Sequence, residues 1–149
     1  MSPLQITILV IAFVGTDLLV ISFVLWSVTG QIRELAGRFP ARDASPDAVT
    51  RRFQSFRFGS VSLGGSFHVG VDEAFLHLQP TWLARRLAIP AMSIPWDEIR
   101  LRDATPRKFK GILGLRATIG TGPGAIDLSG PAWCLEFAEA GKPAPRETL

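Results

Sequence analysis

The sequence predicts an N-terminal transmembrane α-helix followed by a small, mainly-β domain of about seven strands with one C-terminal helix. Three observations support this fold class. Residues 4–28, LQITILVIAFVGTDLLVISFVLWSV, contain one ionisable residue and exceed the roughly 20 apolar residues that cross a bilayer. Beyond residue 52, apolar residues alternate along short segments bounded by Gly, Pro or Asp, which is typical of strands. Residues 129–141, SGPAWCLEFAEAG, carry helix start and stop signals.

The predicted boundaries divide the chain into four segments. Residues 1–28 form the transmembrane anchor, residues 29–52 a juxtamembrane helix and linker, residues 53–141 the β domain and residues 142–149 a disordered tail. The helix is expected to continue through TGQIRELAGRF until Pro40 ends it, because proline lacks the N–H that a helix interior needs. The following PARDASPDA is rich in turn-forming residues and is typical of a linker.

The apolar segment is interpreted as an anchor rather than a cleavable signal peptide. No Lys or Arg precedes it, it is longer than a signal core, and no small-residue cleavage site follows it. Positive charge follows it instead, at Arg33, Arg38, Arg42, Arg51 and Arg52. By the positive-inside rule we expect a single-pass protein of the inner (cell) membrane, with its N-terminus outside and its domain in the cytoplasm.

Asp17 lies near the middle of the apolar segment, where an ionised carboxylate costs about 2.5 to 3.5 kcal/mol on insertion scales. It is therefore a candidate for pairing with a basic or polar residue of another membrane protein. Ala12, Gly15 and Ser22 share a helix face nearly opposite to Asp17, so a small-residue contact would use a different side of the helix. The alternative is a protonated aspartate that is tolerated in a solitary anchor.

Seven strands are expected, at residues 53–61, 66–71, 75–79, 90–94, 99–104, 112–119 and 125–128. Within SIPWDEIRL, Pro95 should end a strand because it cannot donate a ladder hydrogen bond, and Trp96 should fill the corner between the two halves of the sheet. Asp97 and Glu98 then occupy the turn. We interpret this stretch as a bend and not as the edge of an active site, since no His or metal-ligand partner is near the two carboxylates.

The last predicted element is the helix at residues 129–141. Pro131 suits its first turn and Gly141 its end. Trp133 and Phe137 are four residues apart and would share one face, but Trp133, Leu135 and Phe137 also alternate, so a strand remains an alternative.

Several of these motifs resemble one protein family. VGVDEAFLHLQ followed by SIPWDEI resembles the strand, acidic turn, strand and I-P-W-x-x-I segment of bacterial PH-like and GRAM-like domains. LAGRFPAR and IDLSG are similar to segments of small bacterial single-pass membrane proteins that carry such domains. The resemblance implies a PH-like domain, in which a C-terminal helix closes one end of a bent, partly closed sheet. Phe75 departs from the pattern, which commonly has a turn glycine there.

The two histidines, His68 and His77, lie on consecutive predicted strands. Because Val69 and Leu76 belong to the apolar faces of those strands, both histidines are expected on the opposite, solvent-exposed faces. With a two-residue turn at Asp72-Glu73, the two would lie directly across from each other. Two ligands do not make a metal site, so we interpret them as exposed polar positions.

The sequence carries no motif of an enzyme. GTGPGA leads into a strand rather than a helix, so it predicts a hairpin turn and not a phosphate loop. We therefore expect no catalysis, no cofactor and no metal. The net charge of +3 is too small for a nucleic-acid-binding face. The single cysteine, Cys134, excludes an internal disulfide and is expected to be a buried structural thiol.

Two connections combine basic and apolar residues in a way that suits a membrane surface. PTWLARRLAIP contains Trp82, Leu83, Arg85 and Arg86, and TPRKFKG contains Arg107, Lys108 and Lys110. Each basic residue at an anionic surface contributes about 1 kcal/mol. The alternative is that Trp82 and Leu83 cap the core while the charged residues are ordinary solvated surface.

These features predict a membrane-tethered adaptor that binds and does not catalyse. Its cytoplasmic domain would engage an anionic leaflet or an unknown protein partner through the two basic connections, and it would not bind nucleic acid. The alternative is a small accessory subunit of an inner-membrane complex, held through Asp17 and the transmembrane helix.

Overall fold

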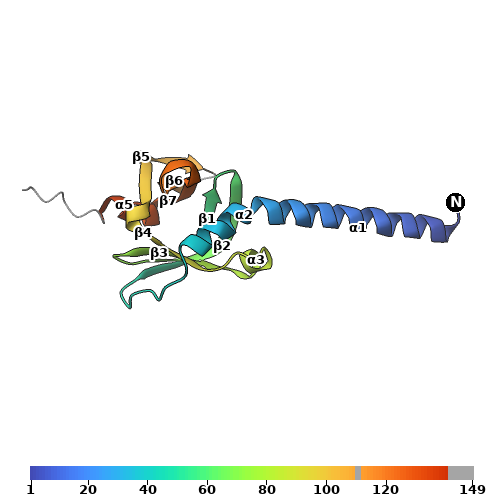
Figure 1. Cartoon of the computed structure of the whole chain (residues 1–149), viewed down its shortest axis with the longest axis horizontal. Coiled ribbons are helices and arrows are strands. Elements are labelled where there is room, and N and C mark those ends of the chain that lie inside the picture. The colour runs from blue at the N-terminus through green and yellow to red at the C-terminus, as the bar shows by residue number, and fades with distance from the viewer. Residues whose placement is uncertain (110–111, 141–149) are drawn as a thin grey trace, which may run out of the picture.

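A computed structural model of the chain describes residues 1–109 and 112–140. The predicted tail, residues 142–149, lies outside the described residues. The first element, α1 (Pro3–Val28), extends away from the β domain (Figure 1), and none of its residues is buried. Its 26 residues span about 39 Å at 1.5 Å per residue. By length and composition, α1 is long and apolar enough to cross a membrane.

The second helix, α2 (Gly30–Arg38), continues from α1 and packs into the β domain. Ile32, Leu35 and Ala36, spaced three and four apart on one face, are buried in the domain core. The helix ends at Arg38, as predicted from the position of Pro40. Pro40 then forms a bridge with Met92, so the chain leaves α2 alongside the sheet.

Seven strands form one antiparallel sheet that curls round the core (Figure 1), in the order β4-β3-β2-β1-β7-β6-β5. The strands are β1 (Val49–Phe58), β2 (Val61–Val71), β3 (Phe75–Pro80), β4 (Met92–Pro95), β5 (Ile99–Phe109), β6 (Ile112–Ile119) and β7 (Ile126–Pro131). The predicted number of strands is confirmed. β1 begins at Val49, four residues before the predicted start, because residues 49–51 pair with the end of β2.

Short helices fill the remaining connections. They are α3 (Trp82–Arg86), α4 (Ala132–Leu135) and α5 (Phe137–Ala140), with 3-10 turns η1 (Trp96–Glu98) and η2 (Gly122–Gly124). The predicted C-terminal helix starts later than expected because β7 continues to Pro131, and the helix is broken into α4 and α5. Trp133 and Leu135 lie in α4 and Phe137 begins α5, so the alternative of a strand there is wrong. GTGPGA joins β6 to β7 as a hairpin turn, as predicted.

Alternating residues of the strands form the core. Phe67, Val69 and Val71 of β2 and Leu76 and Leu78 of β3 are at most 2% exposed, which confirms the predicted apolar faces. Phe56, Phe58 and Phe67 pack their rings together with centroids about 6 Å apart. Cys134 is fully buried, and burial raises the pKa of its thiol to about 12, so the thiol stays protonated at neutral pH.

The stretch from Pro95 to Ile99 is a bend, as the sequence predicts. Pro95 ends β4 and η1 follows. Trp96 is 6% exposed, its Nε1 donates to the Asp72 carbonyl at 2.8 Å, and its ring stacks on Phe137. Ile99 is buried where β5 begins. The tryptophan therefore joins the β2–β3 turn and the C-terminal helices across the corner of the sheet.

The pairing of β2 with β3 differs from the predicted register. Val71 pairs with Leu76, so four residues and not two lie between the paired positions at this turn. His77 therefore pairs with Gly70, and His68 pairs with Gln79. The predicted pairing of the two histidines is wrong because Asp72 Oδ1 accepts hydrogen bonds from the N–H groups of Ala74 and Phe75, which builds a longer turn.

Candidate functional site

The α3 helix presents two apolar and two basic side chains at the surface. Ala84 is fully buried and fixes the helix against the sheet. Trp82 is 66% exposed and Leu83 is 45% exposed, while Arg85 and Arg86 are also exposed. The alternative in which Trp82 and Leu83 cap the core is therefore wrong. The guanidinium of Arg86 lies over the Trp82 ring, 5.6 Å from its centroid.

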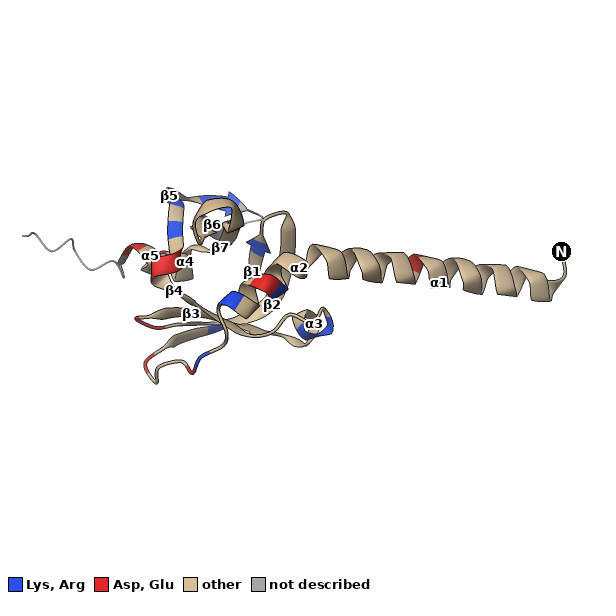
Figure 2. Cartoon of the chain, viewed as in Figure 1, with Lys and Arg blue, Asp and Glu red and all other residues tan. Residues whose placement is uncertain are grey.

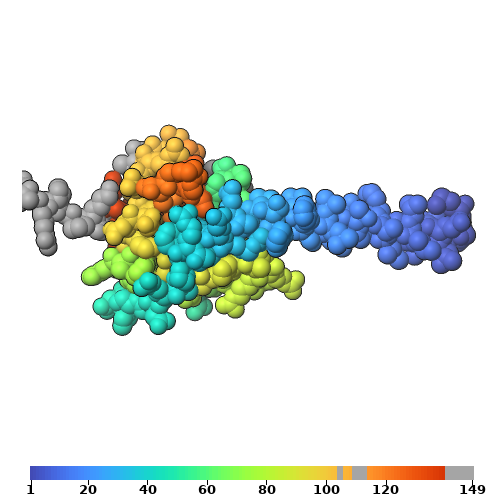
Figure 3. Space-filling model, viewed as in Figure 1, coloured from blue at the N-terminus to red at the C-terminus, as the bar shows by residue number. Residues whose placement is uncertain are grey.

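This helix lies beside the last turns of α1 (Figures 2 and 3), although the two are more than fifty residues apart in the sequence. A shallow groove separates them. Its α1 wall consists of Leu19, Ser22, Phe23, Leu25 and Trp26, and its other wall consists of Arg86 of α3 with Leu87 and Ala88 of the following loop. The structure thus places an exposed basic and aromatic helix against the end of the long apolar helix.

Arg33 of α2 fixes this arrangement. Its guanidinium donates to the carbonyl of Trp26, to Thr29 Oγ1 at 2.7 Å and to the carbonyl of Leu87 at 3.3 Å. It also lies over the Trp26 ring, 4.8 Å from the centroid. Thr29 is buried and donates to the Leu25 carbonyl at 2.8 Å. One side chain therefore connects α1, α2 and the loop that follows α3, which sets the direction in which α1 leaves the domain.

The loop after α3 turns at Ala88, which has φ of 55°. The N–H of Ala88 donates to Arg85 O at 3.0 Å and that of Ile89 donates to Ala84 O at 3.2 Å, so Ala88 closes the helix in the left-handed conformation that glycine usually supplies. Ala88 is also exposed and lines the groove. The backbone strain is thus located at the edge of the groove.

Replacing Ala88 by glycine is expected to raise the free energy of unfolding by about 1 kcal/mol, because glycine adopts positive φ without a Cβ clash. Urea unfolding of the chain and its variant measures the change. Ala41→Gly is the matched control, because Ala41 is exposed and has no positive φ, and it should be neutral or slightly destabilising. Equal effects of the two substitutions would mean that Ala88 carries no strain.

The second basic connection lies elsewhere. Arg107 and Lys108 are exposed on β5, at the opposite edge of the sheet from β4, and Arg107 lies 3.9 Å from Asp103. Figure 2 shows α3 and β5 on opposite sides of the α1 axis. Lys110 lies outside the described residues. The structure therefore brings Trp82, Leu83, Arg85 and Arg86 together, and does not join Arg107 and Lys108 to them.

Asp17 is separate from both basic segments. It lies in α1 and is exposed, and no residue of that helix is buried. No ion pair of the described residues, 1–109 and 112–140, includes it. Its pairing with another membrane protein stays a prediction.

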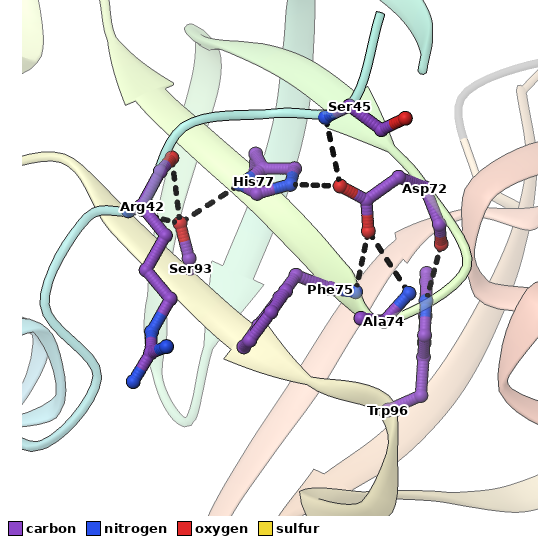
Figure 4. A network of polar contacts seen from close by, with 8 residues as sticks. All are labelled: Arg42, Ser45, Asp72, Ala74, Phe75, His77, Ser93 and Trp96. Atoms are coloured by element: carbon purple, nitrogen blue, oxygen red, sulfur yellow. Dashed lines mark hydrogen bonds and ion pairs between the residues drawn. The ribbon is translucent and has the colours of Figure 1, made fainter. Parts of the chain in front are cut away.

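A buried polar network lies at the other end of β3 and was not predicted (Figure 4). His77 Nε2 lies 2.8 Å from Asp72 Oδ2, and His77 Nδ1 lies 2.8 Å from Ser93 Oγ. The linker joins it from outside the sheet, since Arg42 N–H donates to Ser93 Oγ at 2.8 Å and Ser45 N–H donates to Asp72 Oδ2 at 3.2 Å. His77 is 4% exposed, so the prediction that it is solvent-exposed is wrong.

The electrostatics of this network depend on Asp72. Burial of its carboxyl raises the pKa, but hydrogen bonds from His77 and from the N–H groups of Phe75, Ser45 and Ala74 outweigh that effect and lower the pKa from 3.8 to about 2. Asp72 is thus ionised at neutral pH and accepts all four donors.

Asp, His and Ser in contact also occur in hydrolytic triads. In this chain Ser93 is 3% exposed and its oxygen already accepts the Arg42 N–H. The hydrogen bonds of these three residues therefore connect the linker to β3 and β4. The sequence gives one weak signal, an aspartate that opens a turn before a histidine, and it gives no sign that the linker covers that face.

The described residues, 1–109 and 112–140, contain no group of three His, Cys, Asp or Glu side chains that could hold a metal ion. Comparisons with protein-family models, with curated proteins and with solved structures found no match.

Proposed function

We propose that the chain is a single-pass membrane protein whose cytoplasmic β domain binds, without catalysis, the anionic leaflet next to its anchor. The observation that carries the proposal is α3, with Trp82 and Leu83 exposed and Arg85 and Arg86 beside them, at the base of α1. If α1 spans the bilayer, its last turns lie at the membrane–water interface, where aromatic and basic side chains are favoured.

The contacts between the long helix and the domain support this function. α2 is embedded in the core, and Arg33 joins α1 to the loop after α3. The domain therefore has little freedom to turn α3 away from the surface in which α1 is anchored. The basic residues that follow α1 favour a cytoplasmic location, where the leaflet is anionic.

The fold also supports a binding role. A curled antiparallel sheet of seven strands followed by short C-terminal helices has the element order of a PH-like domain, and we propose that the domain is of this kind. Such a sheet supports binding through its loops, while the core provides only the scaffold.

The test is flotation of the fragment from Thr29 to Leu149 with vesicles of phosphatidylglycerol or phosphatidylcholine at two salt concentrations. We expect binding to the anionic vesicles alone, weaker at high salt. Arg85→Ser combined with Arg86→Ser should lower the partition coefficient about 30-fold, since each residue contributes about 1 kcal/mol. The matched control is Arg100→Ser with Arg116→Ser, which removes the same charge from exposed positions on β5 and β6.

An equal loss of vesicle binding in the two double variants would show that the net charge of the fragment, and not α3, causes binding. No binding by the folded fragment would contradict the proposal and favour a protein partner. Circular dichroism of each fragment verifies folding.

One observation favours a second candidate, an accessory subunit of a membrane complex. No residue of α1 is buried, and Asp17 is exposed on this helix. Asp17→Leu would then dissociate a stoichiometric complex extracted in mild detergent. An unchanged native size would remove this candidate.

A further inference from the structure

We infer that the groove between α1 and α3 binds one anionic phospholipid, with its phosphate on Arg86 and an acyl chain along Leu19 and Phe23. The inference rests on the proposed membrane span and specifies a ligand for the same surface. It differs from attraction of the domain to a charged leaflet, because it requires one lipid in a defined place.

The chemistry of the two walls matches the two parts of a lipid. The wall from α1 is apolar except for Ser22, and it ends at Trp26. The opposite wall carries Arg86, which is the one charged residue among those that line the groove. From Leu19 to Trp26 the helix rises about 10 Å, which spans the headgroup level and the upper acyl chain. A phosphate beside Arg86 would therefore leave an acyl chain against the apolar wall.

Arg86 is available for this contact. Among the described residues it makes no ion pair, and its guanidinium lies over the Trp82 ring, which leaves its donors to a ligand. Arg33, by contrast, donates to Trp26, Thr29 and Leu87. One arginine thus builds the groove and the other faces it. A guanidinium binds a phosphate through paired hydrogen bonds, which favours a phospholipid over a neutral lipid.

The two walls of the groove are connected within the chain itself. Arg33 connects the Trp26 carbonyl to the Leu87 carbonyl, one on each wall. Ala88 keeps its strained φ of 55° at the rim, and its methyl group replaces the hydrogen that a glycine would place there. A preformed site loses less entropy on binding. A second copy of α1 is the competing occupant, but the last turn of α1 contains no acidic residue to pair with Arg86.

The experiment is native mass spectrometry of the full chain, extracted in mild detergent and supplied with equal phosphatidylglycerol and phosphatidylcholine. We expect one phosphatidylglycerol per chain. Arg86→Ser should lower its occupancy relative to phosphatidylcholine about tenfold. Ser22→Phe, which fills the apolar wall, should remove the bound lipid without touching the domain.

Two matched controls accompany these variants. Arg85→Ser removes an equal charge from α3 outside the groove, and Val20→Phe adds an equal ring to α1 outside the groove. Both should retain the lipid. Excess inorganic phosphate should not displace it, because the apolar wall contributes to binding.

Several results would overturn the inference. The first is an equal loss of bound phosphatidylglycerol in Arg85→Ser and Arg86→Ser, and the second is retention of the lipid in Ser22→Phe. The others are displacement of the lipid by inorganic phosphate and a species of two chains without lipid. If vesicle flotation still depends on α3 in that case, the proposed function stands and only the groove site fails. If vesicle flotation fails while the chain retains the lipid, the groove site stands and the proposed function fails.

Discussion

Gly130→Ala is expected to lower the free energy of unfolding of the β domain by about 3 kcal/mol, at the upper end of what overpacking costs. Gly130 lies in β7 opposite Leu115. A Cβ at this position would lie 2.5 Å and 2.7 Å from two ring carbons of Phe56. Because Phe56 is 2% exposed and its ring contacts those of Phe58 and Phe67, it cannot withdraw without moving its neighbours.

Urea unfolding of the fragment from Thr29 to Leu149, which keeps every core residue, measures this effect. Gly64→Ala is the matched control, because its Cβ would meet nothing closer than Ser55 Oγ at 3.9 Å and should change stability by less than about 0.5 kcal/mol. In the double variant, Phe56→Leu should recover part of the loss from Gly130→Ala, which would locate the clash at that ring. An unfolding midpoint of Gly130→Ala equal to that of Gly64→Ala would contradict the explanation.

The elements of the fold could be predicted because their signals are local. Alternation places Val69 and Leu78 in the core, and proline chemistry places the bend at Pro95. The periodicity of α2 is also visible in the sequence, but its packing into the domain core is not. That packing depends on Ile32 and Leu35 meeting strands that are distant in the chain.

The histidine prediction failed for a nonlocal reason. Because side chains alternate along a strand, His77 is predicted on the face of β3 opposite Leu76 and Leu78, and this placement is correct. The face is buried because the linker returns over it, through Arg42 and Ser45. No property of the strand sequence reports what covers its second face.

The candidate site was predicted in part. The mixture of apolar and basic residues in PTWLARRLAIP indicated a surface segment, but not that it lies against α1. That placement depends on the contact between Arg33 and the Leu87 carbonyl, 54 residues apart. Residue composition thus identified α3, and tertiary structure identified the groove.

Asp72→Ala is expected to lower the free energy of unfolding at neutral pH by about 3 kcal/mol, since hydrogen bonds to a charged group contribute about 1.5 to 3 kcal/mol each and part of the loss is recovered by solvation. The carboxylate accepts hydrogen bonds from the turn, from His77 and from the linker. Asp127→Ala is the control. Its ion pair with Arg102 is about 60% exposed, so it should cost less than about 1 kcal/mol.

The pH dependence separates the charge of Asp72 from its role in the turn. Its folded pKa of about 2 lies below the ordinary value of 3.8, so ionisation of Asp72 stabilises the fold above about pH 4. The difference between the two pKa values corresponds to about 2 kcal/mol, which is lost as the pH falls from 4 to 2.

Asp72→Asn tests this dependence, because its amide oxygen still accepts from Ala74 and Phe75 but carries no charge. The stability difference between the wild type and Asp72→Asn should therefore be largest at neutral pH and decrease by about 2 kcal/mol as the pH falls from 4 to 2. Urea unfolding at a series of pH values provides the measurement. A difference that stays constant over this range would mean that Asp72 stabilises the domain only by closing the turn, and that the ionised carboxylate contributes nothing through His77 and Ser45.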